Sequence, residues 1–276
     1  MVYIAKSFTF VCLVLVAMPL VSSFSKHQHH SRFNFAMNAI PCDEYQMSWE
    51  PAMARRISKK RGREREKGRP FMVAIVGIPG SGKTTSASLL ANVLQTEYGI
   101  ETMVMPHDGY HYSLDQLKQV FVDSADAIYR RGAPDTFDPV SLDRDLQRIR
   151  NNKEESQIFL PGFDHARGDP ELDRHEFDRN RHKIVICEGL YLLHDGDGWE
   201  QVANNFDFSI LVDADVDKCI EQVKIRNQCI PGYTVEEILE RCERVDRANA
   251  MTVLRGRCRA DEIVQSLGFG TSPISS

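Results

Sequence analysis

The chain has 276 residues, of which 42% are hydrophobic and 26% are charged, as is typical of a folded globular protein. Its formal net charge of −5 is unevenly spread: residues 51–70 hold nine basic and two acidic residues, and residues 71–276 hold 22 basic and 34 acidic ones. An acidic domain repels nucleic-acid phosphates, so we expect no nucleic-acid partner. The seven cysteines form no CxxC pair or Cys/His metal spacing, so we expect reduced thiols, with Cys187 buried in a strand.

An apolar stretch near the N-terminus predicts a cleavable signal peptide over residues 1–23. It follows Lys6, runs from Phe8 to about Leu20 and ends in small residues. The stretch is shorter than the roughly 20 apolar residues of a membrane span. We therefore expect no membrane partner for the mature protein.

Residues 24–68 are predicted to be a transit-peptide-like segment followed by a basic linker. Residues 24–41 are rich in His, Ser and Asn, include Lys26 and Arg32, and contain no acidic residue. A signal peptide that ends just before Phe24 and precedes such a segment resembles the bipartite leader of algae with secondary plastids, such as diatoms. That resemblance implies a plastid location. Ordinary secretion and an uncleaved signal anchor remain alternatives.

Residues 69–270 are predicted to form one α/β domain, with a short tail over residues 271–276. Continuous apolar runs predict strands buried on both faces, and runs with helical periodicity lie between them. We expect strands at residues 71–76, 102–105, 184–187, 208–212 and about 263–264, and helices that include residues 87–94, 142–149 and 235–245. Strands that alternate with helices indicate a parallel sheet.

A complete phosphate-binding P-loop follows the first predicted strand. Residues 77–84 match the pattern GxxxxGK(S/T), in which glycines let backbone N–H groups surround a phosphate at a helix N-terminus. Lys83 is expected to bridge the β- and γ-phosphates of ATP, and the Thr84 hydroxyl to ligate Mg²⁺. The predicted nucleotide-binding residues are Gly77, Pro79, Gly80, Ser81, Gly82, Lys83, Thr84 and Thr85.

Two acidic residues stand at the ends of other predicted strands. Asp108 follows the second strand, and Glu188 ends the strand that begins at residue 184. Since the carboxyl ends of parallel strands line one edge of a sheet, both carboxylates should lie on the P-loop side. Asp108 could take the proton of an acceptor hydroxyl, and Glu188 could join the metal site. No Asn-Lys-x-Asp segment is present, which argues against a GTPase.

Two loops rich in Arg, Asp, His and aromatic residues complete a pattern along the chain. They span residues 129–139 and 161–170. The order of P-loop, Asp-Gly-Tyr, Arg-Gly-Ala-Pro-x-Thr-Phe-Asp, Phe-Asp-His and Glu-Gly-x-Tyr-Leu-Leu resembles the phosphoribulokinase/uridine kinase family. The likeness is closest to the branch of uncharacterised nucleoside- or sugar-kinase-like proteins related to pantothenate kinase. It covers residues 71–264.

The resemblance implies a three-layer P-loop NTPase fold with a five-stranded parallel sheet and a helical lid. It also implies that Asp108, Lys83 and Arg226 are catalytic, with Arg226 closing over the phosphates, and that Thr84 and Glu188 hold Mg²⁺. The implied substrate-binding residues are Tyr110, Arg130, Arg131, Asp135, Phe163 and His165.

The function expected from these features is transfer of the γ-phosphoryl group of ATP to a hydroxyl of a small metabolite. Nucleosides, sugars, sugar phosphates and pantothenate-like acids all remain open as acceptors, because the shape of a pocket and not a motif selects among them. The alternative is a nucleotide-binding regulatory ATPase without a small-molecule acceptor. The sequence does not indicate an oligomeric state.

Overall fold

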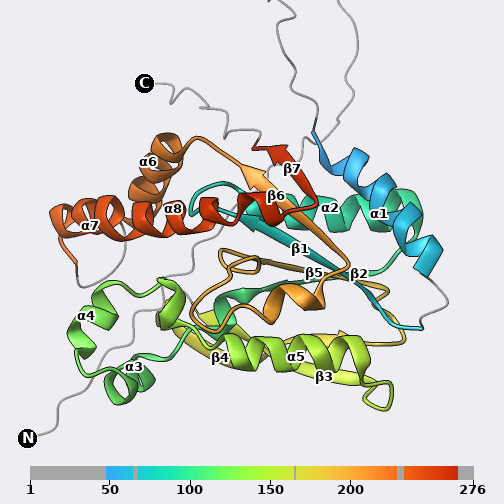
Figure 1. The fold of residues 1–276 in the computed structure, drawn as a ribbon, viewed down its shortest axis with the longest axis horizontal. Coiled ribbons are helices and arrows are strands. Elements are labelled where there is room, and N and C mark those ends of the chain that lie inside the picture. Colours follow the sequence, from blue (N-terminus) through green and yellow to red (C-terminus); the bar gives the residue numbers. More distant parts are fainter. Residues whose placement is uncertain (1–47, 65–67, 165, 229–232, 267–276) are drawn as a thin grey trace, which may run out of the picture. The chain divides into compact units, whose positions relative to one another are not determined.

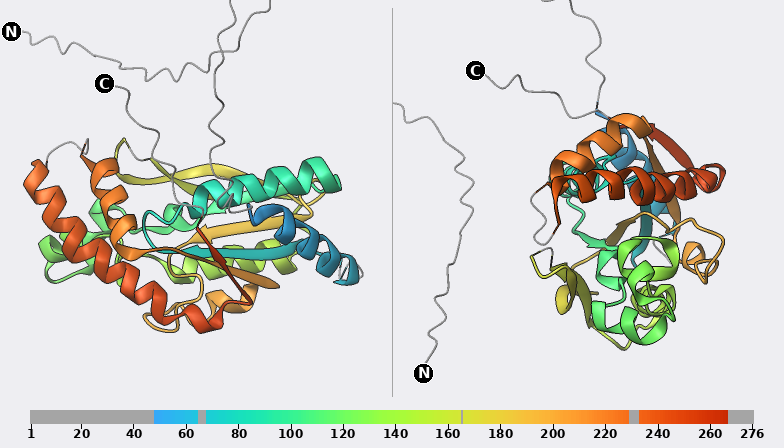
Figure 2. Two further views of the ribbon diagram at one scale, coloured as in Figure 1. Left: turned by 90° about the horizontal axis from the view of Figure 1, so that it is seen from above. Right: turned by 90° about the vertical axis from the view of Figure 1, so that its left-hand side faces the viewer.

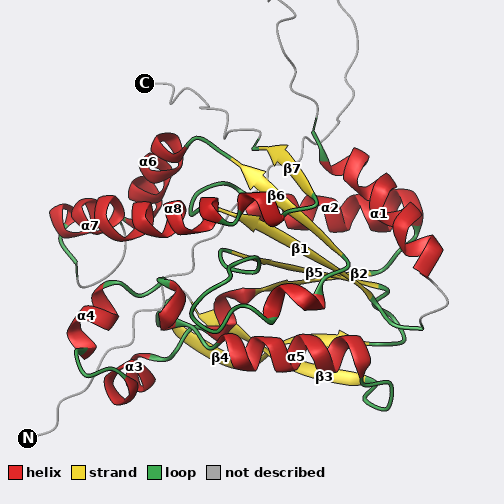
Figure 3. Ribbon diagram, viewed as in Figure 1, coloured by secondary structure: helices red, strands yellow, loops and turns green. Residues whose placement is uncertain are grey.

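The computed structural model describes residues 48–64, 68–164, 166–228 and 233–266 (Figure 1). The predicted signal peptide, the transit-like segment, His165 and the tail lie outside the described residues. Helices or 3₁₀ turns separate the strands of the parallel sheet along the chain, as predicted (Figure 3). No helix within the described ranges is both long and apolar enough to cross a membrane.

A five-stranded parallel sheet forms the centre of the fold, which confirms the predicted α/β class. Its strands stand in the order β2-β5-β1-β6-β7. They are β1 (Phe71–Gly77), β2 (Thr102–Pro106), β5 (Ile184–Gly189), β6 (Phe208–Asp213) and β7 (Glu262–Gln265). β1 therefore lies between β5 and β6, and the P-loop follows the central strand. Pro106 of β2 pairs with Glu188 of β5, so these two strands end side by side.

Both faces of the sheet are covered, which gives the three layers expected from the sequence. Alternate residues of β1 point to opposite faces, as the two-residue period of a strand requires. Met72, Ala74 and Val76 enter one buried cluster, whereas Phe71, Val73 and Ile75 enter another. The first cluster packs against α5 (Pro139–Asn151), α8 (Arg247–Arg255) and a hairpin, and the second packs against α1 (Glu50–Glu64) and α2 (Lys83–Tyr98). Cys187 is fully buried in the first cluster, as predicted.

Two helical groups flank the end of the sheet that carries the P-loop (Figures 1 and 2). One comprises α6 (Val216–Asn227) and α7 (Val235–Arg241), and the other comprises α3 (Leu114–Val120) and α4 (Ser124–Tyr129). The predicted helix over residues 235–245 is longer than expected. α7 continues through a π-helical turn, Cys242–Asp246, directly into α8. Short 3₁₀ turns are η2 (His107–Tyr110), η3 (Pro134–Thr136), η4 (Val202–Asn205) and η6 (Arg257–Arg259).

An antiparallel hairpin includes residues 161–170, which were predicted to be a loop. It consists of β3 (Gln157–Asp164) and β4 (Asp169–Asp178). Ile158 and Leu160 alternate inward along β3 and are buried, but a register shift between Leu160 and Gly162 interrupts the pairing. The Pro-Gly pair at this shift is a turn signal, and it hid the strand from sequence analysis.

The expected domain start at residue 69 is wrong for this structure. Residues predicted as a basic linker form α1, which buries Ala54 and Ile57 against the face that α2 covers. Its basic residues spread around the rest of the helix: the guanidinium of Arg56 and the ammonium of Lys60 lie over the ring of Phe208, 5.5 and 4.5 Å from its centroid. The apolar stripe of this helix is narrow, and the many charged residues around it give the sequence the composition of a linker.

Candidate active site

The P-loop joins the central strand to α2. β1 ends at Gly77 and α2 begins at Lys83, so the N–H groups of the first helical turn face the loop. Gly80 adopts a left-handed backbone, with φ of 79°, and a Cβ there would come within 2.5 Å of the carbonyl oxygen of Cys219. Glycine is therefore required where the loop passes α6. Ser81 is buried, and its carbonyl accepts a hydrogen bond from the Ser266 hydroxyl.

A cavity of about 220 Å³ lies between the P-loop and α6. Its walls are Gly80, Gly82, Lys83, Thr84, Thr85, Gln222, Val223 and Arg226. The structure thus places Arg226, which was predicted from resemblance alone, next to the phosphate loop. No sequence motif includes Gln222, although its spacing of four residues from Arg226 puts it on the same helix face.

Thr84 and Glu188 meet at the mouth of the P-loop. The Thr84 hydroxyl donates a 2.9 Å hydrogen bond to Oε1 of Glu188, whose side chain is almost fully buried. A hydroxyl and a carboxylate oxygen side by side are the ligand types that Mg²⁺ prefers, and this ion usually takes its remaining ligands from phosphates and water. Among the described residues no cluster of three or more His, Cys, Asp or Glu could hold a metal by itself. The pair therefore fits a metal that a nucleotide also ligates.

Asp108 lies in η2, directly after β2, with its carboxylate partly exposed to solvent. Nδ1 of His107 lies 3.0 Å from Oδ1 of Asp108. The surrounding protein removes part of the water around the Asp108 carboxylate, and this desolvation would raise its pKa. The hydrogen bond from His107, together with the electrostatic influence of His107, His111 and Lys83, outweighs this desolvation and lowers the pKa of Asp108 below its usual value. The carboxylate is therefore ionised, and it lies within the electrostatic reach of Lys83.

An aromatic wall continues from Asp108 toward the hairpin. The His111 ring lies 3.8 Å from the Phe137 ring and 5.0 Å from the Phe163 ring, measured between centroids. Its Nδ1 lies 2.8 Å from the Asp108 carbonyl oxygen. Burial lowers the pKa of His111 to about 4, so the ring is neutral at neutral pH. His111 therefore contacts both Asp108 and Phe163, so these two predicted site residues lie close together. No sequence motif indicated a role for His111.

The predicted substrate-binding arginines stabilise the two loops of residues 129–139 and 161–170. Arg131 donates to the Tyr112 carbonyl (2.7 Å), to Asp169 (2.9 Å) and to the Gly168 carbonyl. It thereby joins the loop after α4 to the hairpin. Arg130 forms ion pairs with Asp126 and with Asp135, two residues of the same segment. Arg130, Arg131 and Asp135 therefore form ion pairs with other side chains of the same protein.

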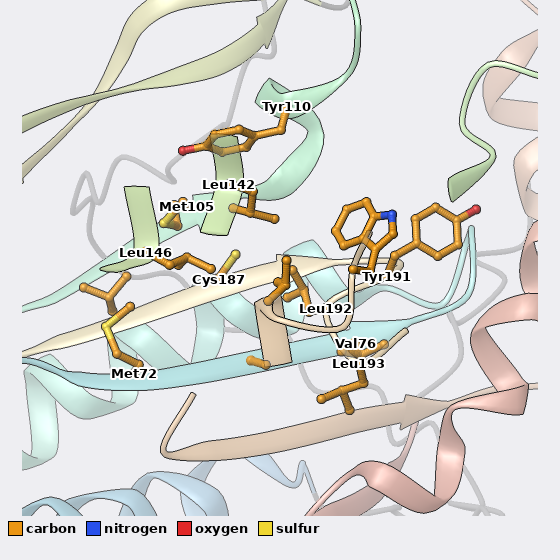
Figure 4. Close-up of a cluster of buried hydrophobic side chains, with 14 of the residues drawn as sticks. Met72, Val76, Met105, Tyr110, Leu142, Leu146, Cys187, Tyr191, Leu192 and Leu193 are labelled. Carbon is orange, nitrogen blue, oxygen red and sulfur yellow. The ribbon is translucent and has the colours of Figure 1, made fainter. Parts of the chain in front are cut away.

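The structure corrects the expectation for Tyr110. Its side chain is buried in the core beside Met105, Leu142 and Cys187 (Figure 4). Its hydroxyl donates a 3.1 Å hydrogen bond to Oδ2 of Asp145, a buried residue of α5. The hydroxyl that was expected to meet a substrate is thus used within the core. η2 turns this ring inward, whereas the preceding Asp108 side chain reaches solvent.

A P-loop at the end of the central strand and carboxylates at two neighbouring strand ends define the class of the protein as a P-loop kinase. Residues 72–271 match the Phosphoribulokinase / Uridine kinase family, and the chain belongs to this family. Both statements confirm the resemblance read from the motifs.

Individual relatives agree with this assignment. "Putative uridine kinase C227.14" of Schizosaccharomyces pombe is 32% identical over 209 residues, which cover 74% of this chain and 87% of that protein. A pantothenate kinase of Pasteurella multocida is 33% identical over 152 residues, which cover 54% of this chain and 45% of that protein. The crystal structure of a "putative fructose transport system kinase" from Silicibacter sp. TM1040 matches with a TM-score of 0.63 and 26% identity, over 75% of this chain and 98% of that one. The chain is therefore an ATP-dependent small-molecule kinase, that is, a phosphotransferase with an alcohol group as acceptor.

Proposed function

We propose that the protein transfers the γ-phosphoryl group of ATP to a hydroxyl of a small metabolite, with Asp108 as the group that receives the hydroxyl proton. The observation that carries this proposal is the carboxylate of Asp108 directly after β2, beside the strand end where Glu188 accepts a hydrogen bond from Thr84 of the P-loop. An acceptor hydroxyl bonded to Asp108 would face the γ-phosphate. Its oxygen forms the new P–O bond as the bond to ADP breaks, and its proton passes to Asp108 and then to water.

The lowered pKa of Asp108 suits a reaction in which the proton moves late. Enzymatic phosphoryl transfer has a loose transition state, so it depends mainly on positioning and on charge neutralisation. Asp108 would first orient the hydroxyl and accept its proton only as the P–O bond forms. Lys83 and Arg226 would neutralise charge on the transferred group from opposite sides of the cavity.

Thr84 and Glu188 would hold Mg²⁺ together with the phosphates of ATP. The 2.9 Å hydrogen bond between their oxygens supports this assignment, because it brings two hard oxygen ligands together beside the P-loop. When bound, Mg²⁺ neutralises the negative charge of the β- and γ-phosphates. Glu188 is fixed by its place in β5, and Thr84 is fixed by the first turn of α2.

We also propose a neutral acceptor, which carries neither a phosphate nor a carboxylate group. Each arginine that the structure describes within residues 129–139 and 161–178 forms an ion pair with a carboxylate. The pairs are Arg130 with Asp126 and Asp135, Arg131 with Asp169, Arg167 with Asp164, and Arg174 with Glu171. A phosphate on the acceptor would have to displace one of these carboxylates. A nucleoside, a sugar or another polyol would instead meet the aromatic surface of His111 and Phe163.

A metabolite screen tests the reaction and the acceptor class together. Purified protein, Mg²⁺ and ATP are incubated with matched pools of neutral polyols and nucleosides, of their monophosphates and of pantothenate-like acids, and products are detected by mass spectrometry. We expect a product 80 Da heavier than a neutral acceptor. A product from a phosphorylated or acidic acceptor would refute the acceptor class alone. ATP hydrolysis that no pool stimulates, without any phosphorylated product, would favour the regulatory ATPase.

We propose a plastid location on the basis of the leader alone. The leader lies outside the described residues, so only its composition supports the proposal. In a diatom, residues 1–47 fused to a fluorescent protein should direct it to the plastid, and a Phe24→Ala fusion should leave it outside. Secretion of the unaltered fusion would contradict the proposal.

A further inference from the structure

We propose that His107 is the positioning residue of Asp108, and that the Glu188-Gly189-Leu190 segment at the end of β5 holds it in place. The inference rests on the proposed role of Asp108 in phosphoryl transfer. His107 opens η2 and lies directly before Asp108, and its side chain is 1% exposed, whereas that of Asp108 is 39% exposed. A partly solvated carboxylate is free to rotate unless a fixed donor holds it. His107 Nδ1, 3.0 Å from Oδ1, is such a donor.

The second ring nitrogen of His107 decides which tautomer is present. The backbone N–H of Leu190 donates a 3.2 Å hydrogen bond to Nε2 of His107. Because Nε2 accepts this bond, the ring proton must be on Nδ1, the nitrogen that faces Asp108. The imidazole therefore passes a directional constraint from the end of β5 to the carboxylate after β2.

Packing prevents the ring from taking another orientation. It is stacked on Phe137 with ring centroids 4.7 Å apart, and Trp199 and Tyr191 lie 5.9 and 6.2 Å away. On the remaining side, a Cβ at position 189 would lie 2.4 Å from Cγ of His107 and 2.7 Å from its Nδ1. Gly189 is thus needed so that the ring can lie against the strand end.

This arrangement links the two acidic strand ends of the candidate site. Glu188, Gly189 and Leu190 are consecutive: the first accepts from Thr84, the second makes room for His107 and the third fixes its tautomer. The direction of the Asp108 carboxylate is therefore set relative to the same strand end that carries Glu188. Losing the constraint should slow the chemical step and leave nucleotide binding intact.

Two substitutions separate the two hydrogen bonds of His107. In His107→Asn, the amide nitrogen occupies the place of Nδ1 and can still donate to Asp108. In His107→Gln, the longer side chain reaches the place of Nε2, so it can accept from Leu190 but no longer donates to Asp108. We expect His107→Asn to keep kcat within about threefold of wild type and His107→Gln to lower kcat about 30-fold, with KM for ATP unchanged in both, because a misplaced catalytic group costs rate rather than affinity.

His182→Asn serves as the control. His182 lies just before the amino end of β5, opposite the strand end that carries Glu188, and its ring accepts a hydrogen bond from the backbone N–H of Asp178. This variant should keep the wild-type kcat. Equal kcat values for His107→Asn and His107→Gln, or a loss in either that follows a rise in KM for ATP, would overturn the inference. If the wild-type enzyme phosphorylates no acceptor, it is the proposed function that fails.

A double-mutant cycle tests the role of Gly189 and does not depend on how the Asn or Gln side chain at position 107 is oriented. Gly189→Ala should lower kcat about tenfold in the wild-type background and have little further effect in the His107→Ala background, because the clash is then absent. Gly62→Ala is the matched control, since nothing lies within 4 Å of a Cβ at that position. Additive effects of Gly189→Ala and His107→Ala would contradict the arrangement.

The tautomer of His107 can be measured on the wild-type protein without any acceptor, and no variant has to be active. Long-range ¹H–¹⁵N spectra of the wild-type protein, assigned by the loss of one ring in His107→Asn, should show a protonated Nδ1 and an unprotonated Nε2 for His107. A proton on Nε2, or on both nitrogens, would overturn the inference whether or not any acceptor is known.

Discussion

Replacing Tyr110 with phenylalanine distinguishes a core residue from a substrate contact. The Tyr110 hydroxyl donates a 3.1 Å hydrogen bond to Oδ2 of buried Asp145, whose other oxygen accepts from Arg148 at 2.9 Å. Burial, and then the charge of Asp145, raise the pKa of Tyr110 well above its usual value, so the hydroxyl stays protonated as a donor. Tyr110→Phe leaves Oδ2 of Asp145 without this partner.

The expected cost follows from the type of bond that is lost. A hydrogen bond to a charged group contributes about 1.5–3 kcal/mol, and the lower end applies because Arg148 remains bonded to Asp145. A loss of about 1.5 kcal/mol lowers the Tm of a domain of this size by roughly 3–6 °C. The loss is measured by urea and thermal unfolding, alongside steady-state kinetics. KM for the acceptor should stay within about twofold, because the ring does not face the site.

Tyr98→Phe, on α2, is the control, and its unfolding free energy should change by less than about 0.5 kcal/mol, as for substitutions that break no buried bond. An unchanged Tm for Tyr110→Phe, combined with a KM for the acceptor raised tenfold or more, would refute the core assignment. That result would restore Tyr110 as a substrate contact.

Three further predictions concern the metal site, a buried ion pair and acid stability. Glu188→Gln should raise the Mg²⁺ concentration for half-maximal activity at least about tenfold, measured by Mg²⁺ titration, and an unchanged requirement would remove Glu188 from the metal site. Asp207→Asn should cost about 3 kcal/mol in urea unfolding, because this buried carboxylate accepts from Arg69, Arg150 and the Met72 N–H; a cost below about 1 kcal/mol would contradict the pairing. The folded pKa of His111 is about 4, below the unfolded value, so the unfolded state binds the proton first and stability falls as pH drops from about 6.5 to 4. Between these pH values, the free energy of unfolding of His111→Asn should fall by up to about 3 kcal/mol less than that of the wild type. Identical pH profiles of the two proteins would refute the lowered pKa of His111.

The parts of the site that were predictable depend on local pattern and on one topological rule. Strand β1, the P-loop and α2 are adjacent in the chain, so their order alone identifies the phosphate site. Asp108 and Glu188 are far apart in sequence, but Asp108 directly follows β2 and Glu188 lies at the end of β5, and the carboxyl ends of parallel strands lie on one side of a sheet. Family resemblance added Arg226, which the structure places beside the P-loop.

The parts that were not predictable depend on contacts between distant segments. The bonds of Arg131 to the hairpin need Asp169, 38 residues away, so composition could not separate a structural arginine from a substrate-binding one. The inward turn of Tyr110 is set by the 3₁₀ geometry of η2, which has no clear sequence pattern. The histidine that faces Asp108 is its direct neighbour, but its role depends on the Leu190 N–H, which only the folded sheet brings near.

The most direct test of the central claim follows a labelled phosphate. With [γ-³²P]ATP, Mg²⁺ and an acceptor found by the screen, the wild-type enzyme should transfer label to the acceptor. Asp108→Asn should lower that rate at least about 100-fold while nucleotide affinity, measured by calorimetry, stays unchanged, because proton acceptance and alignment of the hydroxyl are lost and the P-loop is intact. Asp108→Asn enzyme that transfers label at the wild-type rate, or wild-type enzyme that releases label only as inorganic phosphate, would contradict the account.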